Sequence, residues 1–312
     1  MSEALVNAAA THETLSVALP PPETPWQRFR REYFSSKIAA VALVLLIVTL
    51  FVAFGAPWIS PQDPYDLASL EIFDSKLPPG SVSEFSGMTY WLGTDGQGRD
   101  MLSAIFYGLR TSLMVGFVSV AISLLVGCWV GMTAAYFGGW VDSLLMRIVD
   151  IQLSFPSILI ALILLAVLGQ GVDKVVIALI IAQWAYFARA ARGSALVEST
   201  KEYIEAAECM SLGSIRILMK HLLPNCLPPL IVIATINVAH AIILESTLSF
   251  LGVGVPVTEP SLGMLIKNGF DYIQSGEYWI CFFPGIALAL AIISINLVGD
   301  QLRDVLNPHN SN

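Results

Sequence analysis

The chain has 312 residues, of which 55% are hydrophobic and only 13% charged, and its mean hydropathy is +0.71. A soluble domain needs a more polar surface than this composition can supply. The net charge of −8 comes from acidic residues spread over the ends and loops, and no basic stripe is present to hold nucleic-acid phosphates. The composition therefore predicts an all-α integral membrane protein and excludes a nucleic-acid-binding module.

The N-terminal residues 1–37 are predicted to form a cytoplasmic tail. Residues 1–25 are polar and then proline-rich, which is typical of disorder. The first transmembrane helix is predicted at residues 38–58, twenty-one residues without a charge. At about 1.5 Å per residue this run covers about 31 Å, enough to cross the hydrocarbon core. It is too long, and begins too far into the chain, for a signal peptide.

Residues 59–110 form a polar segment that is expected outside the cytoplasm. It ends in the glycine-rich sequence WLGTDGQGRD, residues 91–100. This sequence lacks the Lys and Ser/Thr that a phosphate-binding loop carries after its last glycine, so ATP binding is not predicted here. We expect a glycine-permitted turn, with Asp100 near the start of an amphipathic helix of residues 101–110 in the membrane interface.

Five further apolar runs in residues 111–300 predict the core of the protein, which makes six transmembrane helices in all. Pro156 is expected to bend the third helix, and Arg147 and Asp150, one helical turn apart, are expected to neutralise each other. Residues 301–312 are predicted to form a second cytoplasmic tail. The five spans are expected at residues 111–137, 144–168, 175–188 and onward, 227–251 and 278–298.

The distribution of basic residues predicts the orientation. With the N-terminus in the cytoplasm, eleven Lys and Arg residues fall inside and five outside, which satisfies the positive-inside rule. Six spans then place both termini, and the loop of residues 189–225, in the cytoplasm. The inner residues are Arg28, Arg30, Arg31, Lys37, Arg147, Arg189, Arg192, Lys201, Arg216, Lys220 and Arg303.

The loop of residues 189–225 is the one long polar segment between apolar runs. It predicts two short helices, residues 203–210 and 215–223, separated by a turn in which Ser214 can cap the second helix. The second helix carries Ile215, Leu218 and Leu222 on an apolar side, and Pro224 ends it or opens the next span. The first exposes a face of small residues at Ala206 and Ala207, which would allow close approach by a partner.

Within this loop, EYIEAAECMSLG with Pro224 seventeen residues after Ala207 resembles the EAA loop of permease subunits in bacterial ABC importers. More narrowly, it is similar to the second permease of the dipeptide, oligopeptide and nickel importers. The family's glycine six residues after Glu205 is Ser211 here, with Gly213 two positions later, which leaves room for a displaced turn. Read alone, the loop would also fit an ordinary amphipathic cytoplasmic loop. Three further blocks resemble the same family: WLGTDGQGRDMLSAIFYGLRTSL, LESTLSFLG, and GDQLRD followed by Pro308.

The resemblance implies a permease of the type I ABC importer fold, in a bacterial inner membrane, that takes up short peptides. It implies a heterodimer with a homologous second permease, two ATP-binding subunits that use ATP and magnesium, and an extracytoplasmic substrate-binding protein. The chain carries no Walker motif, so it is predicted to be non-catalytic and to bind no cofactor itself. The resemblance implies that the residues coupling it to the ATPases are Tyr203, Glu205, Ala206, Ala207, Ser211, Gly213, His221 and Pro224.

Polar residues within the fifth span are the candidates for the translocation pathway. Asn237, His240 and Glu245 would line it, or His240 would be satisfied by a neighbouring helix and Glu245 would lie at the outer interface. The four cysteines, expected to be small apolar packing residues, are Cys128, Cys209, Cys226 and Cys281.

Alternative functions remain open at this point. Within the same importer class, nickel complexes, glutathione-like peptides or oligosaccharides are alternatives to short peptides. A secondary transporter without ATPase partners is less favoured, because only His240 lies well inside the membrane. A membrane-embedded enzyme is disfavoured because the four histidines are scattered and form no reactive cluster.

Overall fold

The computed structural model describes residues 24–66 and 70–306, and these form a bundle of long helices. Nearly all of the predicted disordered tail, and Pro308, lie outside the described residues. The helices are α2 (Pro25–Tyr33), α3 (Lys37–Ile59), α4 (Met101–Phe137), α5 (Gly139–Leu153), α6 (Ser157–Leu168), α7 (Val172–Ser199), α8 (Glu202–Cys209), α9 (Ser214–Ile217), α10 (Leu223–Phe250), α11 (Leu262–Phe270) and α12 (Trp279–Leu306). Short elements are the 3-10 helices η2 (Ile72–Asp74) and η4 (Ile273–Ser275), the π-helical η3 (Leu218–Leu222), and the antiparallel strands β1 (Ser81–Val82) and β2 (Thr89–Tyr90).

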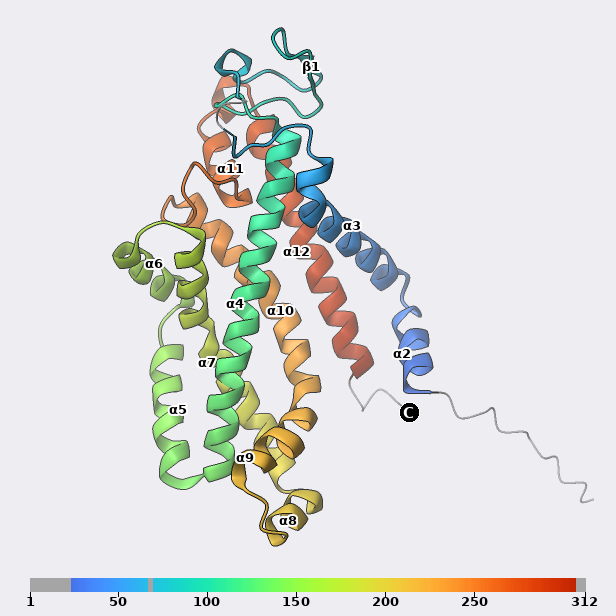
Figure 1. Cartoon of the computed structure of the whole chain (residues 1–312), viewed down its shortest axis with the longest axis vertical. Coiled ribbons are helices and arrows are strands. Elements are labelled where there is room, and N and C mark those ends of the chain that lie inside the picture. The colour runs from blue at the N-terminus through green and yellow to red at the C-terminus, as the bar shows by residue number, and fades with distance from the viewer. Residues whose placement is uncertain (1–23, 67–69, 307–312) are drawn as a thin grey trace, which may run out of the picture.

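Long apolar helices dominate the fold, as predicted. Within the described residues, five helices are long and apolar enough to cross a membrane, and the bent pair α5–α6 makes a sixth if it counts as one span. The five are α3, α4, α7, the continuous run Ser214–Phe250 that ends with α10, and α12. Figure 1 shows α4 running through the centre of the bundle, with α7, α10 and α12 beside it. The all-α membrane architecture is therefore confirmed.

Pro156 breaks the third span instead of merely bending it. The axes of α5 and α6 differ by 84°. Proline disfavours helical geometry at the residue before it, so α5 ends at Leu153 and α6 begins only after Pro156. The expected pairing of Arg147 with Asp150 is wrong, because the carboxylate of Asp150 forms an ion pair with Arg189 of α7 instead. A charge on a neighbouring helix therefore competes successfully with the one on the same helix.

The helix α4 is continuous from Met101, so no separate interfacial helix precedes the second span. Asp100 caps it by accepting hydrogen bonds from the Ser103 N–H at 2.9 Å and the Ser103 hydroxyl at 2.6 Å. The turn before it uses positive φ angles at Gly93 and Gly98, as the glycine-rich sequence predicted. Thirty-seven residues span roughly 55 Å, more than the ~30 Å of hydrocarbon, so α4 continues beyond the membrane.

The loops at the top of Figure 1 form a folded cap (residues 60–66, 70–100 and 251–278). At its centre the Asp74 carboxylate accepts hydrogen bonds from Ser83 at 2.6 Å and from Tyr90 at 2.9 Å. Burial and the neighbouring Asp74 raise the pKa of Tyr90 to about 12. Arg99, almost fully buried, donates to the Val257 carbonyl at 3.3 and 3.4 Å. Segments far apart in the sequence are thereby joined into one unit.

Two separate hydrophobic clusters make up most of the core. The larger lies among α4, α7, α10, α11 and α12, and the smaller joins α4, α7 and α10 to α8 and α9. Close approach of α4 and α7 depends on glycine, because a Cβ at Gly127 would lie 2.7 Å from the Ala188 nitrogen. Cys128 and Cys226 are buried in the smaller cluster as expected, Cys281 is half-buried, and Cys209 is exposed, which the packing role did not predict.

Candidate functional site

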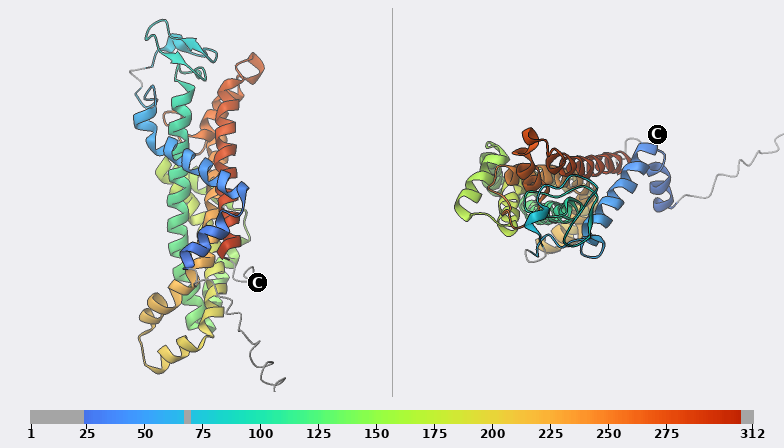
Figure 2. Two further views of the ribbon diagram at one scale, coloured as in Figure 1. Left: turned by 90° about the vertical axis from the view of Figure 1, so that its right-hand side faces the viewer. Right: turned by 90° about the horizontal axis from the view of Figure 1, so that it is seen from above.

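The α8 segment (residues 201–213) lies at the end of the molecule opposite the cap (Figure 2). Ile204 and Ala207 are buried in the smaller hydrophobic cluster, whereas Glu205 and Ala206 are exposed. The predicted exposed face of small residues is therefore confirmed for Ala206 and wrong for Ala207, so only Ala206 is available to a partner. Ala207 instead fixes the helix to the bundle, and this leaves Glu205 and Ala206 projecting from a supported surface.

The turn after α8 is not displaced by the missing glycine. Ser211 itself adopts the left-handed conformation, with φ of 55°, while Gly213 has an ordinary φ of −61°. The Ser211 N–H bonds to the Glu208 carbonyl at 2.8 Å and the Leu212 N–H to the Ala207 carbonyl at 3.2 Å. This is a Schellman motif, which normally takes glycine at the position of Ser211. The expected cap is also different, because Gly213 precedes α9 and no side-chain hydrogen bond caps that helix.

Polar contacts hold α8 between the ends of α7 and α10. Lys201, the residue before α8, donates to the Glu198 carboxylate of α7 at 2.9 Å. The Tyr203 hydroxyl meets the side chain of Asn225, whose amide also donates to the His221 carbonyl at 2.7 Å. The α8 segment is thus in contact with α7 through Glu198 and with the start of α10 through Asn225.

The helix leading from α9 into α10 does not end at Pro224. It passes through the π-helical turn η3, just before the proline. Proline cannot donate to the carbonyl four residues earlier and clashes with it, and a widened turn accommodates both effects. Buried side chains lie at both ends of η3, at Leu218 and Leu222, and continue four residues apart along α10 at Cys226 and Leu230.

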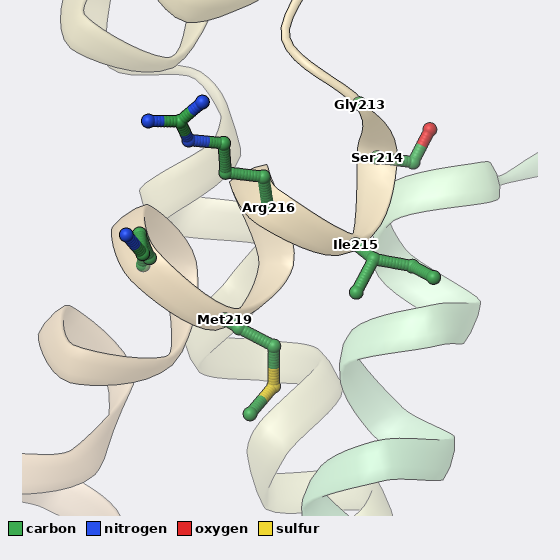
Figure 3. A pocket seen from close by; sticks show the side chains of 6 residues that line it. Gly213, Ser214, Ile215, Arg216 and Met219 are labelled. Atoms are coloured by element: carbon green, nitrogen blue, oxygen red, sulfur yellow. The ribbon is translucent and has the colours of Figure 1, made fainter.

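Ile215 was expected on the apolar side of this helix, but it is 72% exposed, whereas Leu218 is 3% exposed. Ile217, one residue before η3, is buried in its place. Ile215, Arg216 and Met219 line a hollow beside α9, together with Gly213, Ser214 and Lys220 (Figure 3). An exposed isoleucine and a half-exposed methionine, flanked by two cations, form a surface next to the α8 segment that the sequence pattern missed.

Glu245 lies at the other end of α10, fully buried. Its carboxylate accepts hydrogen bonds from Ser112 of α4 at 2.7 Å, and from Ser249 at 2.8 Å and Ser246 at 3.3 Å within α10. Ser261, which caps α11, also reaches this carboxylate. We call these five residues the Glu245 cluster. It joins three helices beneath the cap, so Glu245 faces neither solvent nor an open channel in this structure.

His240 and Asn237 lie one turn apart on α10 but are placed differently from Glu245. His240 is exposed on the surface of the chain, and Asn237 is half-buried with its amide donating to the Ile233 carbonyl at 2.8 Å. The other histidine near a site, His221, is half-buried in η3. The structure thus separates the predicted pathway residues from the predicted coupling residues by about half the length of α10 or more.

Comparison with known families places the chain. Residues 123–312, more than half of the sequence, match the family model described as binding-protein-dependent transport system inner membrane component. Residues 24–79 match the N-terminal transmembrane domain of oligopeptide transport permease C. The chain belongs to this family of transport permeases.

Relatives of this permease are similar over nearly their whole length. It is 36% identical to the di/tripeptide transport system permease protein DppC of Pseudomonas aeruginosa (strain UCBPP-PA14), over 91% of the chain and 92% of the relative. It is 38% identical to the dipeptide transport system permease protein DppC of Escherichia coli (strain K12), over 95% of the chain and 97% of the relative. The resemblance inferred from the four sequence blocks is thereby confirmed.

The fold of the permease matches a solved ABC transporter. A chain of the inward-facing MetNI methionine ABC transporter superposes with a TM-score of 0.53 at 22% identity, covering 66% of this chain and 97% of that one. The family model and the relatives make the permease a non-catalytic, multi-pass inner-membrane subunit of an ABC importer, a class that works with ATPase and binding-protein partners. Among the residues described, no group of three His, Cys, Asp or Glu side chains could hold a metal ion.

Proposed function

We propose that this permease imports short peptides, with ATP hydrolysed by partner subunits. The supporting observation is the likeness to permeases named for dipeptide and di/tripeptide transport, at 36–38% identity over more than nine tenths of the chain. In the proposed assembly it pairs with a homologous second permease as a heterodimer. Peptides arrive from an extracytoplasmic binding protein, and two ATP-binding subunits use ATP and magnesium, while this chain binds no cofactor.

The α8 segment is the proposed docking site for one ATP-binding subunit. Glu205 and Ala206 project from it, Tyr203 contacts Asn225 of α10, and the buried Ala207 and the Ser211 turn fix its shape. His221 lies in η3, the turn that leads into α10. Gly213 and Pro224 lie where α9 and α10 begin. Because α8 is anchored to α7 and α10, closure of the ATPases would move both helices together and change which side of the membrane the pathway faces.

The proposed function implies an orientation of the chain in the membrane and a set of residues that line the peptide pathway. The α8 segment, the N-terminus and the C-terminus lie on the cytoplasmic side, and the cap lies outside. Asn237 and His240 line the translocation pathway on the part of α10 that this chain leaves uncovered. The proposal does not give Glu245 a contact with the peptide, because its carboxylate is already used by serines of this chain.

Purification of the chain from its native membrane in mild detergent tests the assembly. We expect ATP-binding subunits to co-purify, with ATPase activity raised by short peptides together with the binding protein. Recovery of the chain alone under mild extraction would contradict the docking role of α8. Activity raised by nickel complexes or oligosaccharides, and not by peptides, would keep the importer and overturn the substrate.

The substitution Glu205→Arg tests the proposed contact itself. Reversing an exposed charge in the centre of a docking surface should reduce peptide-stimulated ATPase activity roughly tenfold or more, because like charges across an interface repel. Asp304→Arg is the matched control, since Asp304 is also an exposed acidic residue but lies near the end of α12, outside the α8 segment. Normal assembly and transport by the Glu205→Arg chain would refute the contact.

A further inference from the structure

The short helix α2, immediately before the first span, is the feature that the transport function leaves unexplained. Its start is well defined, because Thr24 and Gln27 form a reciprocal capping box and Pro25 occupies the first helical position. Four basic residues lie within or just after it, at Arg28, Arg30, Arg31 and Lys37. This nine-residue helix is thus capped and positively charged. Aromatic side chains lie on one side of it and basic side chains on another.

Aromatic rings follow one side of α2. Trp26 stacks on Phe29 at 5.7 Å and Phe29 on Tyr33 at 6.0 Å between ring centroids. Tyr33 is buried, whereas Trp26, at the far end of the stack, is 70% exposed. A tryptophan on such a helix is suited to the boundary between headgroups and acyl chains.

A hollow with a basic lining lies on another side of α2. It is formed by Gln27, Arg30, Arg31, Phe34 and Ser35. Every polar side chain among these five lining residues can donate hydrogen bonds, and two of them carry permanent positive charge. Glu32, the acidic residue of the helix, does not line the hollow and pairs with Arg28 at 2.7 Å. The hollow thus suits an anion with several acceptor oxygens, and the exposed Phe34 ring beside it suits an apolar tail.

The position of α2 indicates which anion would reach the hollow. Ser36 caps α3 by accepting from the Ala39 N–H at 3.3 Å, so the membrane span begins one residue later at Lys37. The Gln301 side chain of α12 donates to the Glu32 carbonyl at 3.4 Å, which ties α2 to the end of the bundle. Figure 1 shows α2 beside the lower end of α12. The hollow is therefore held at the level where phospholipid headgroups meet the first span.

We propose that this hollow binds the phosphate of an anionic phospholipid, with Arg30 and Arg31 holding the headgroup and Phe34 and Trp26 seated among the acyl chains. Guanidinium groups bind phosphate oxygens bidentately, and basic residues beside a span are attracted to anionic leaflets. The site would lie on the same side of the membrane as the α8 segment, so a bound lipid would fix α2 and α12 against the bilayer while α8 moves.

Lipid retention by the full-length chain tests the proposal. The chain is reconstituted in nanodiscs of equal parts phosphatidylglycerol and phosphatidylcholine, extracted in mild detergent, and its bound lipids are counted by native mass spectrometry. We expect the wild-type chain to retain phosphatidylglycerol preferentially. The double variant Arg30→Gln/Arg31→Gln should lose roughly twenty-five-fold in this preference, at roughly fivefold per cation near an anionic surface.

The control is Arg110→Gln/Lys174→Gln, which removes two positive charges from other helices and should keep the preference. The variant Arg30→Lys/Arg31→Lys keeps the charge but not the planar fork, so it should fold and retain an intermediate preference. Excess inorganic phosphate should not displace the lipid, because it lacks the apolar tail. Equal loss in the control, unchanged retention in Arg30→Gln/Arg31→Gln, or displacement by free phosphate would each overturn the proposal.

Discussion

The two ends of α10 are built on opposite principles. Under the cap, the helix carries the Glu245 cluster, and glycines of neighbouring segments pack against it, so that a Cβ at Gly116 would lie 2.8 Å from Ile242. At the α8 end, the helix begins with the π-helical turn η3 and contains prolines at positions 224, 228 and 229. The cap end is held to neighbouring helices by polar side-chain contacts. At the α8 end, the prolines and the π-helical turn interrupt the regular backbone hydrogen bonds of the helix.

This difference indicates where the helix can yield. Moving the cap end would strand a buried carboxylate and its serine donors, which is costly in a low-dielectric interior. Moving the α8 end needs only side chains of the smaller cluster to slide past one another around a π turn, a feature frequent at functional sites. We infer that, when α8 moves α7 and α10, α10 bends near η3 while its cap end serves as the fixed point.

Removal of the buried Glu245 carboxylate is the strongest test of whether the cap end of α10 is the more firmly held one. Glu245→Ala leaves the hydroxyls of Ser112, Ser246 and Ser249 without their acceptor and opens a cavity, so the free energy of unfolding should fall by about 3–5 kcal/mol. Glu245→Gln keeps the volume and one acceptor oxygen and should lose about 1–2 kcal/mol. Unfolding of the purified chain in detergent, followed by circular dichroism, gives both values.

His240→Ala is the control for that experiment. His240 is exposed on the same helix, so its truncation should change the stability by less than about 1 kcal/mol. If Glu245→Ala were as stable as His240→Ala, the cap end would not be the fixed point of α10.

A matched pair of glycines compares the two ends directly. A Cβ at Gly254, in the cap segment just after α10, would lie 2.6 Å from the Ser249 hydroxyl and 2.8 Å from its nitrogen, whereas at Gly213 nothing lies within 4 Å. Gly254→Ala should therefore lower the stability by about 2 kcal/mol through overpacking. Gly213→Ala should stay within about 0.5 kcal/mol of wild type, since its φ of −61° suits alanine. Equal melting temperatures for the two variants would remove the contrast.

The cap itself should weaken in alkali, because Tyr90 holds its proton more tightly when folded. Its pKa is raised from 10.0 to about 12 by burial and by Asp74. Below about pH 10 the proton is present in both states and the contribution is complete. As the pH rises toward 12, only the unfolded state ionises, so stability is lost, by up to roughly 2 kcal/mol after allowance for solvent screening.

The variant Tyr90→Phe isolates that effect. It removes the hydrogen bond to Asp74 and should lower the melting temperature at neutral pH, but its further decline from about pH 9.5 to 11.5 should be shallower than that of wild type. Parallel declines would mean that Tyr90 does not report the opening of the cap.

The sequence predicted the parts of this molecule that depend on local chemistry. Long apolar runs fixed the spans, and glycines with Asp100 fixed the turn into α4. The sequence did not predict contacts between helices, because no local pattern shows that Asp150 pairs with Arg189 or that Ser112 of α4 reaches Glu245 of α10. The exposure of Ile215 was missed because a helical period was assumed through η3. The spacing of Leu218, Leu222 and Cys226, four residues each time, was the available signal.

The smallest predicted effect has the opposite sign and concerns the α8 end. Ser211 holds a φ of 55°, a conformation that costs non-glycine residues of order 1 kcal/mol. Ser211→Gly should therefore raise the free energy of unfolding by about 0.5–1 kcal/mol, after the greater flexibility of glycine in the unfolded chain is counted. Ser214→Ala is the control, because Ser214 makes no capping hydrogen bond and should change little. Since the Ser211 turn shapes the proposed docking helix, hydrogen exchange at Leu212 should slow in Ser211→Gly. Faster exchange there would show that the serine stabilises the turn, and the strain argument would fail.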